Sequence, residues 1–153
     1  MSLISFATYQ EGDAEEMHEI IFEVFEEALK VHTSVEGIST FYQIINPEEL
    51  VKRHADGAVL VKVIYDQLPA GFFELNGSHL KLIFIKKSYR GKGIARACLE
   101  WIQQYLVQHQ LERRITLMSA RPAAAVYTQM GFAATGPYVT KQGLTSLPME
   151  LRF

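Results

Sequence analysis

The chain has 153 residues, 48% of them apolar, and a formal net charge of −2 at pH 7. This length suffices for one hydrophobic core, so we expect a single domain over residues 1–153. The small negative charge argues against a nucleic-acid-binding surface. The lone cysteine, Cys98, cannot form an internal disulfide, and neither a signal peptide nor a run of about 18 apolar residues is visible. We therefore expect a cytoplasmic protein with no membrane or nucleic-acid partner and no metal site.

The N-terminal segment predicts a strand followed by an amphipathic helix. Residues Leu3–Thr8 alternate as a half-buried strand does. Asp13 followed by Glu16 has the spacing of a capping box, which would begin a helix. The apolar residues of this helix share one stripe that should face the core, namely Met17, Ile20, Ile21, Val24, Phe25 and Ala28.

Two further helices are expected before the next strand. Residues Glu36–Ile45 carry apolar side chains at helical spacing. Asn46 and Pro47 give a clearer start signal, with Asn46 as N-cap and Pro47 at the first helical position. Glu49 stands at the capping-box position, so a short helix should extend to about His54.

Three strands should follow as consecutive hairpins. The first is the β-branched run Ala58–Tyr65, and Asp66–Pro69 turns the chain into the second, Gly71–Leu75. Asn76-Gly77 is a strong signal for a two-residue turn. It should join the second strand to an antiparallel third strand that begins at His79.

A strand, a basic loop and a long helix form the centre of the chain. Leu80–Ile85 is rich in β-forming residues, and Lys86–Gly93 is basic and contains two glycines. The helix that follows has an apolar stripe made of Ile94, Ala97, Cys98, Trp101, Ile102 and Tyr105. On that stripe we interpret Cys98 as a small apolar core residue and not as a reactive thiol.

The loop has the features of a phosphate-binding turn. The first N–H groups of a helix have no intrahelical partner and lie at the positive end of its dipole, so they bind anions. Gly91 and Gly93 allow the backbone to approach such an anion closely. Arg90, Lys92 and Arg96 add positive charge around the same turn. A multiply phosphorylated ligand is therefore expected here.

The C-terminal part predicts two strands separated by a short helix and a third, terminal strand. Arg113–Met118 is a short apolar strand, and Pro122 should start a helix that ends before Gly131. Phe132–Thr135 returns to extended structure, and Leu147–Phe153 should be the last strand. The order of elements indicates an α/β domain with a mixed sheet.

Residues Arg90–Ala95 have the pattern Arg/Gln-x-x-Gly-x-Gly/Ala after a strand and before a helix. With this context the chain resembles the GCN5-related N-acetyltransferases (GNAT). The resemblance covers essentially the whole chain and implies a mixed, mostly antiparallel sheet, flanked by helices and splayed between its fourth and fifth strands, Leu80–Ile85 and Arg113–Met118. Acetyl-coenzyme A would be the co-substrate, with its pantetheine arm in the gap. The resemblance places the coenzyme contacts at the backbone of Ile83 and Ile85 and at Arg90, Gly91, Lys92, Gly93, Ile94, Ala95 and Arg96.

The same resemblance suggests the general acid. Tyr127 lies in Ala123–Phe132, a segment similar to the family's Ala-x-x-x-Tyr-x-x-x-Gly-Phe, in which the tyrosine points at the coenzyme sulfur. It would protonate the leaving thiolate. The alternative is a purely structural role, because Tyr127 shares a helical stripe with Val126 and Met130 and could be a core residue.

His79 is the best candidate base. It stands eleven residues before Arg90, a distance at which some members of the family place a catalytic glutamate or histidine. The alternatives are Glu74, Glu36, water alone, or a strand-end histidine with no catalytic role.

The implied activity is transfer of an acetyl group from acetyl-coenzyme A to a primary amine of a small molecule or peptide by direct attack on the thioester. Two alternatives remain open at this point: an acyltransferase that uses a longer acyl-coenzyme A, and a non-catalytic acyl-coenzyme A sensor that needs neither Tyr127 nor His79. The sequence does not identify the acceptor, and the oligomeric state is open between monomer and homodimer.

Overall fold

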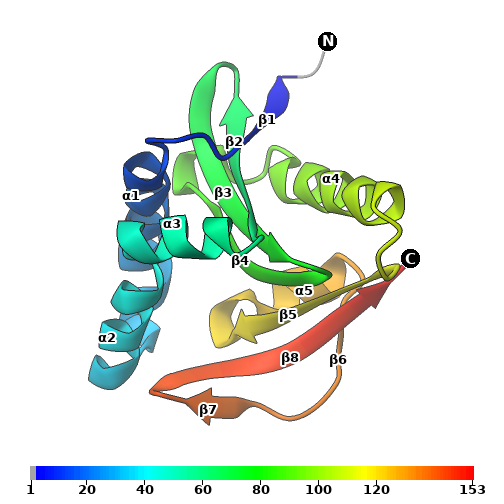
Figure 1. The fold of residues 1–153 in the computed structure, drawn as a ribbon. Helices are drawn as coiled ribbons and strands as arrows, with labels where there is room; N and C mark the ends of the chain where they lie inside the picture. The colour runs from blue at the N-terminus through cyan, green and yellow to red at the C-terminus, as the bar shows by residue number, and fades with distance from the viewer. Residues whose placement is uncertain (1–2) are drawn as a thin grey trace.

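The computed structural model describes residues 3–153, which form one mixed sheet with helices on both faces (Figure 1). Its strands are β1 (Ile4–Thr8), β2 (Val59–Tyr65), β3 (Leu68–Asn76), β4 (His79–Ile85), β5 (Arg114–Ala120), β6 (Ala133–Ala134), β7 (Val139–Lys141) and β8 (Leu144–Arg152). They lie in the order β1-β2-β3-β4-β5-β8-β6, with β7 paired to β8. All pairs are antiparallel except β4 and β5. The predicted mixed, mostly antiparallel sheet is confirmed.

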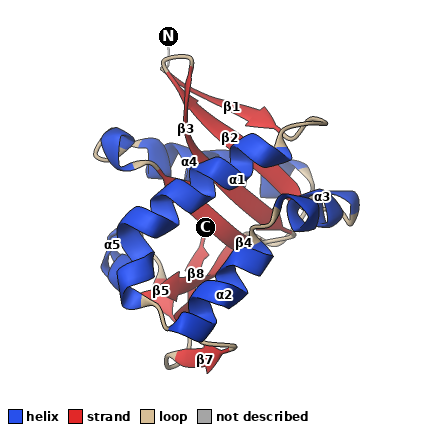
Figure 2. Ribbon diagram, turned by 90° about the vertical axis from the view of Figure 1, so that its left-hand side faces the viewer, coloured by secondary structure: helices blue, strands red, loops and turns tan. Residues whose placement is uncertain are grey.

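The main helices are α1 (Ala14–Val24), α2 (Val35–Ile44), α3 (Pro47–Ala55), α4 (Ile94–Gln108) and α5 (Ala124–Gln129). Helix α1 continues into a π-helical turn, Phe25–Leu29. Helices α1, α2 and α3 pack on one face of the sheet, and α4 and α5 pack on the other (Figure 2).

The sheet separates two hydrophobic cores. The core beneath α4 contains the buried residues Cys98, Ile102 and Leu117, together with side chains of β2 and β3. The core beneath α1–α3 contains most of the predicted stripe of α1, including Met17 and Phe25. The apolar alternation along the strands thus divides the side chains between two helical layers, as expected for a sheet covered on both faces.

Strands β4 and β5 separate soon after they meet, as Figure 1 shows. Their parallel register contains His79 opposite Thr116 and Leu80 opposite Leu117, and no later pair within residues 3–153. On its other edge β4 pairs with β3 as far as Ile85. The fourth and fifth strands are therefore splayed, as the family resemblance implied, and the edge of β4 beyond Leu80 has no strand partner.

Several local predictions need correction. The turn between β3 and β4 consists of Gly77 and Ser78, because Asn76 pairs with His79; the predicted turn at Asn76-Gly77 was one residue early. The capping box at Asp13 is wrong, since its carboxylate makes no cap hydrogen bond to α1. That carboxylate instead accepts from the backbone N–H of Gln10 and from Lys62.

The predicted start of α3 is confirmed, whereas one short strand and the true start of the last strand were not predicted. The side chain of Asn46 accepts from the backbone N–H of Glu48, and Pro47 begins α3, as predicted. Strand β7 was not predicted; it consists of three exposed residues, so it lacks the apolar alternation that marks a strand in sequence. The last strand, β8, also begins three residues earlier than the predicted Leu147.

Candidate active site

The loop before α4 has the geometry expected of a phosphate cradle. Gly91 and Gly93 have φ of +78° and +77°, a left-handed conformation that glycine adopts without strain. Gly93 is the N-cap of α4, and no side chain caps the first turn. Apart from its chain neighbours, a Cβ placed at either glycine would meet no heavy atom of residues 3–153 within 4 Å. The space in front of the unpaired N–H groups of α4 is therefore open to an anion.

The positive charges of the loop are partly engaged by other groups. The guanidinium of Arg90 forms an ion pair with Glu27 of the π-helical turn at 2.7 Å, and its Nε–H donates to the carbonyl oxygen of Ile85 at 3.2 Å. The ammonium of Lys92 lies 5.5 Å from the ring centre of Tyr65. Arg96 is exposed. The expected cluster of charge exists, but Arg90 is paired with the π-helical turn that follows α1, a contact that the sequence did not suggest.

The backbone of β4 is irregular where the sheet opens. Between β3 and β4 the register shifts, because Leu75 pairs with Leu80 whereas Glu74 pairs with Leu82. Lys81 is therefore an extra residue in β4, a β-bulge. Ile83 and Ile85 follow it and are half-buried against the α4 core. Their main-chain groups lie along the edge that has no β5 partner, which suits them to bind a ligand through the backbone.

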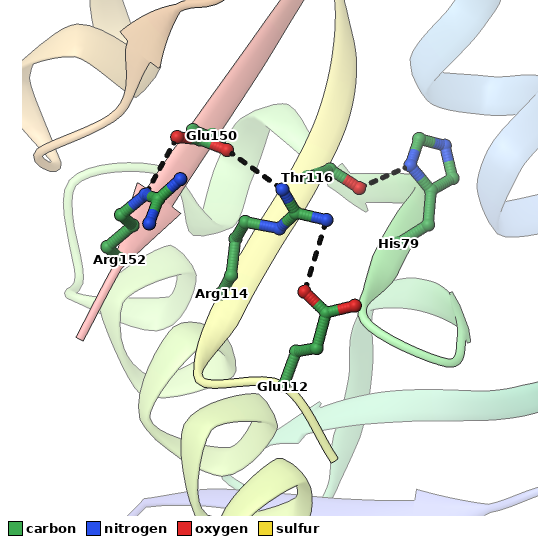
Figure 3. A network of polar contacts seen from close by, with 6 residues as sticks. All are labelled: His79, Glu112, Arg114, Thr116, Glu150 and Arg152. Atoms are coloured by element: carbon green, nitrogen blue, oxygen red, sulfur yellow. Dashed lines mark hydrogen bonds and ion pairs between the residues drawn. The ribbon is translucent and has the colours of Figure 1, made fainter.

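His79 lies where β4 and β5 are still paired. Its Nδ1 is 2.8 Å from Oγ1 of Thr116 on β5, and Figure 3 shows the two side chains pointing toward one another. Burial, with a smaller effect from the positive charge of Lys81, lowers the pKa of His79 below its usual value. The imidazole is therefore neutral at physiological pH. Thr116 was not predicted as part of the site.

The surface of β5 and β8 next to this pair carries a chain of ion pairs (Figure 3). Arg114 contacts Glu112 at 3.1 Å and Glu150 at 3.5 Å, and Glu150 also pairs with Arg152 at 2.9 Å. Hydrogen bonding from Arg152 is the main cause that lowers the pKa of Glu150. Since both carboxylates are paired with arginines, this network holds β5 to β8 and offers no additional base.

Tyr127 lies on the opposite face of the sheet from His79. It projects from α5 toward the α4 core and packs edge-on against Phe132, with ring centres 5.7 Å apart. Burial raises the pKa of Tyr127 to about 12. The predicted acid and base therefore do not contact each other, because the sheet lies between them.

The rival bases have other contacts. Glu74 is fully buried and binds Arg53 through two hydrogen bonds of 2.7 and 3.0 Å, and it also accepts from Asn76. Glu36 is exposed on the first turn of α2, against the turn between β7 and β8 at Gly143. A carboxylate with three donors already in place is poorly suited to take a proton from substrate.

Cys98 is fully buried in the α4 core. Its side chain is buried on α4, and burial raises the pKa of its thiol to about 12. A thiol so rarely ionised is a poor nucleophile. The interpretation of Cys98 as a core residue is consistent with this environment.

Comparisons with known proteins agree with this geometry. A family model described as an acetyltransferase (GNAT) domain matches residues 29–153. A search of curated protein sequences found no match. Among solved structures, a GCN5-related N-acetyltransferase from Rhodopseudomonas palustris has a TM-score of 0.82 at 18% identity, covering 100% of this chain and 98% of that one.

Two further structures carry more specific names. PaiA N-acetyltransferase from Thermoplasma acidophilum, in complex with coenzyme A, has a TM-score of 0.79 at 19% identity and full coverage of both chains, 100% and 100%. A spermidine N-acetyltransferase SpeG chimera from Vibrio cholerae and hSSAT has a TM-score of 0.65 at 18% identity, covering 99% of this chain and 96% of that one. Among residues 3–153, no helix is both long and apolar enough to cross a bilayer. The family match over most of the sequence shows that the chain belongs to the GNAT family and is an acetyltransferase with acetyl-coenzyme A as its co-substrate.

Proposed function

We propose that the protein transfers the acetyl group of acetyl-coenzyme A directly to a primary amine of a small molecule or peptide. The observation that carries this proposal is the open edge of β4, which begins beyond Leu80, two residues after His79, and leads at Ile85 into the loop before α4. A long ligand with phosphate at one end can lie along this edge with its other end beside the imidazole. The chain holds no accessible thiol for a covalent relay, since Cys98 is its lone cysteine and is buried.

The coenzyme would be held mainly by backbone groups. The N–H groups of residues 91–96 would bind the pyrophosphate, and the main chain at Ile83 and Ile85 would bind the pantetheine amides. Ile94 contributes only its backbone, because its side chain is buried in the core. Lys92 and Arg96 would supply charge, and Arg90 would do so if its contact with Glu27 loosens. When bound, acetyl-coenzyme A supplies the thioester that is attacked.

His79 would take the proton of the attacking amine. This role requires that Nδ1–H donates to Oγ1 of Thr116, because that tautomer leaves Nε2 unprotonated and able to accept. Thr116 would thus be a positioning residue. The lowered pKa of His79 keeps the base in its neutral form, although it also makes the imidazole a weaker base.

Tyr127 would donate a proton to the leaving sulfur. With a pKa of about 12 it stays protonated throughout the neutral range. Transfer to an ordinary thiolate would be unfavourable, but the same burial that acts on Tyr127 raises the pKa of a thiol. Cys98 in the same core illustrates this, because its pKa is also about 12. A coenzyme sulfur held next to Tyr127 would share part of this burial, which would make the proton transfer less unfavourable.

The direct test is thiol release from acetyl-coenzyme A with a panel of primary amines, together with calorimetry of coenzyme binding. We expect binding without an acceptor and thiol release only when a suitable amine is added. Rapid release without any amine, or a stable acetylated protein isolated before the amine is added, would contradict direct transfer.

A further inference from the structure

An open cavity of about 450 Å³ lies between α2, α3 and the turn that joins β7 to β8. This volume is within the range of small-molecule sites. The turn is fixed against α2, because Thr40 Oγ1 donates to the carbonyl oxygen of Gln142 at 2.7 Å and Ser34 Oγ donates to that of Gly143 at 3.0 Å. The cavity is lined by Thr40, Gln43, Ile44, Asn46, Glu48, Glu49, Arg53 and Gln142.

Arg53 is the most firmly held of these lining residues. Its Nε–H and Nη2–H donate to the two carboxylate oxygens of Glu74, which has 0% exposure, and Asn76 Nδ2 donates to the same carboxylate. Asn76 is also the cross-strand partner of His79. The guanidinium is thus fixed on the same face of the sheet as the candidate base, and one strand away from it.

Some N–H donors of this guanidinium have no hydrogen-bond partner within residues 3–153. A guanidinium has five N–H donors, and Glu74 takes two of them. The remaining donors have no partner within residues 3–153, and the Arg53 side chain keeps 20% of its surface exposed. A buried ion pair such as Glu74–Arg53 adds little to the stability of the fold, because the cost of desolvating both charges offsets their mutual attraction. An arginine pre-oriented toward a cavity is better explained by recognition of a ligand.

The charges around the cavity restrict what that ligand can be. Glu48, Glu49 and Glu74 carry three carboxylates against the single guanidinium of Arg53. A ligand carboxylate would add to this excess of negative charge, whereas a cationic amine would reduce it. A plain alkylamine, once protonated, has donors but no acceptor for Arg53. An amide carbonyl is a neutral acceptor, and the side-chain amides of Gln43 and Gln142 suit the rest of a peptide unit.

We propose that this cavity is the acceptor subsite and that Arg53 recognises an amide carbonyl of a cationic acceptor, so that the substrate is an amine that carries a carboxamide or peptide bond. The proposal rests on the transferase function proposed above and narrows its acceptor class. Glu74 and Asn76 position Arg53, and Glu48 and Glu49 favour the positive charge of the incoming amine.

Three acceptors with the same alkylamine end provide the test: ε-aminocaproamide, ε-aminocaproate and hexylamine. They differ at the far end, which is a carboxamide, a carboxylate or a hydrocarbon. We expect kcat/KM to be about 10- to 100-fold higher for the carboxamide than for the other two, the factor typical of a hydrogen bond to a charged group. A blocked tripeptide with a central lysine is tested beside ε-aminocaproamide, and the comparison shows whether the preferred carbonyl belongs to a peptide bond or to a free carboxamide.

The decisive variant is Arg53→Lys, which keeps the charge beside Glu74 but loses the planar set of additional donors. We expect it to remove most of the preference for the carboxamide over hexylamine. The double variant Arg53→Gln with Glu74→Gln tests the same point without leaving a buried carboxylate unpaired. Lys52→Gln is the matched control, since Lys52 is exposed on the same helix and does not line the cavity; it should keep the preference.

Direct binding separates this proposal from the transferase function. If no amine is acetylated, direct transfer fails, and nuclear magnetic resonance shifts at the cavity on titration with ε-aminocaproamide then decide about the subsite. Shifts that Arg53→Lys abolishes would support it. Equal use of the three acceptors, a preference for the carboxylate, or a carboxamide preference that survives in Arg53→Lys would overturn it.

Discussion

The glycine turn gives a prediction whose size can be worked out from the structure. Gly93→Ala introduces a Cβ at φ +77°, where no heavy atom of residues 3–153 other than those of the chain neighbours lies within 4 Å. The cost to the fold is therefore confined to backbone strain, about 1–2 kcal/mol for an L-residue in this region. For a chain of this length that corresponds to a fall in melting temperature of roughly 2–8 °C. The folded protein should survive the substitution.

Coenzyme binding should suffer more than stability. The new methyl group would occupy the space into which the N–H groups of α4 point, so the pyrophosphate would lose at least one charge-assisted hydrogen bond. Such a bond contributes about 1.5–3 kcal/mol, which is roughly a 10- to 150-fold increase in the dissociation constant. Calorimetry with acetyl-coenzyme A measures this directly.

Gly12→Ala is the matched control. Gly12 has φ +95°, and a Cβ there also meets nothing within 4 Å, but it lies before α1 and away from the turn. The two variants should lose similar stability, and only Gly93→Ala should lose coenzyme affinity. Equal, unchanged affinity in both folded variants would refute the placement of the pyrophosphate at this turn.

Substitutions at three other positions test the proton transfers. Tyr127→Phe keeps the ring contact with Phe132 and should lower kcat about 100-fold with little change in KM; near-normal turnover would leave Tyr127 as a core residue. His79→Gln should remove the acidic limb of the pH profile of kcat/KM. In the unsubstituted protein this limb should lie below pH 6.5, because burial lowers the pKa of His79 and the rate rises as the imidazole loses its proton; a limb that persists in the glutamine variant would exclude this base. Thr116→Val removes the hydroxyl that fixes the tautomer of His79, so it should reduce kcat/KM about tenfold, whereas Thr116→Ser keeps the hydroxyl and should keep the rate. Equal rates for the valine and serine variants would show that Thr116 does not position His79.

The elements of the coenzyme turn could be predicted because their signals are local in the sequence. The apolar run of β4, the two glycines and the helical spacing of α4 are each legible within a few residues. The positive φ of Gly91 and Gly93 could also be expected from the sequence, because glycine adopts this conformation without strain. The splay between β4 and β5 was different, because it came from the family resemblance and not from any pattern in either strand.

Contacts between distant residues could not be predicted in this way. Arg53 and Glu74 are 21 residues apart, His79 and Thr116 are 37 apart, and Glu27 and Arg90 are 63 apart. Each pair depends on how strands and helices come together, which spacing along the chain does not encode. Polar residues at otherwise apolar positions, such as Glu74 within β3, are the one available signal, because a buried carboxylate requires a partner.

Local signals also failed where tertiary contacts competed with them. Asp13 had the right neighbour for a capping box, but Lys62 from β2 and the backbone of Gln10 took its carboxylate. The turn lies one residue later than expected, at Gly77-Ser78, because Asn76 is a strand residue opposite His79. In both cases the surrounding sheet offered an alternative partner that the isolated motif could not anticipate.

The arrangement of His79 and Tyr127 fits the reaction proposed for the seam between β4 and β5. An amine attacking a thioester loses its proton on the side from which it approaches, and the sulfur gains one on the side toward which it leaves. Here the sheet lies between the proposed base and acid, with His79 beside Thr116 on the α1–α3 face and Tyr127 in the α4 core. If the two residues act as proposed, a substrate in the open seam would reach both groups and would couple the two proton transfers.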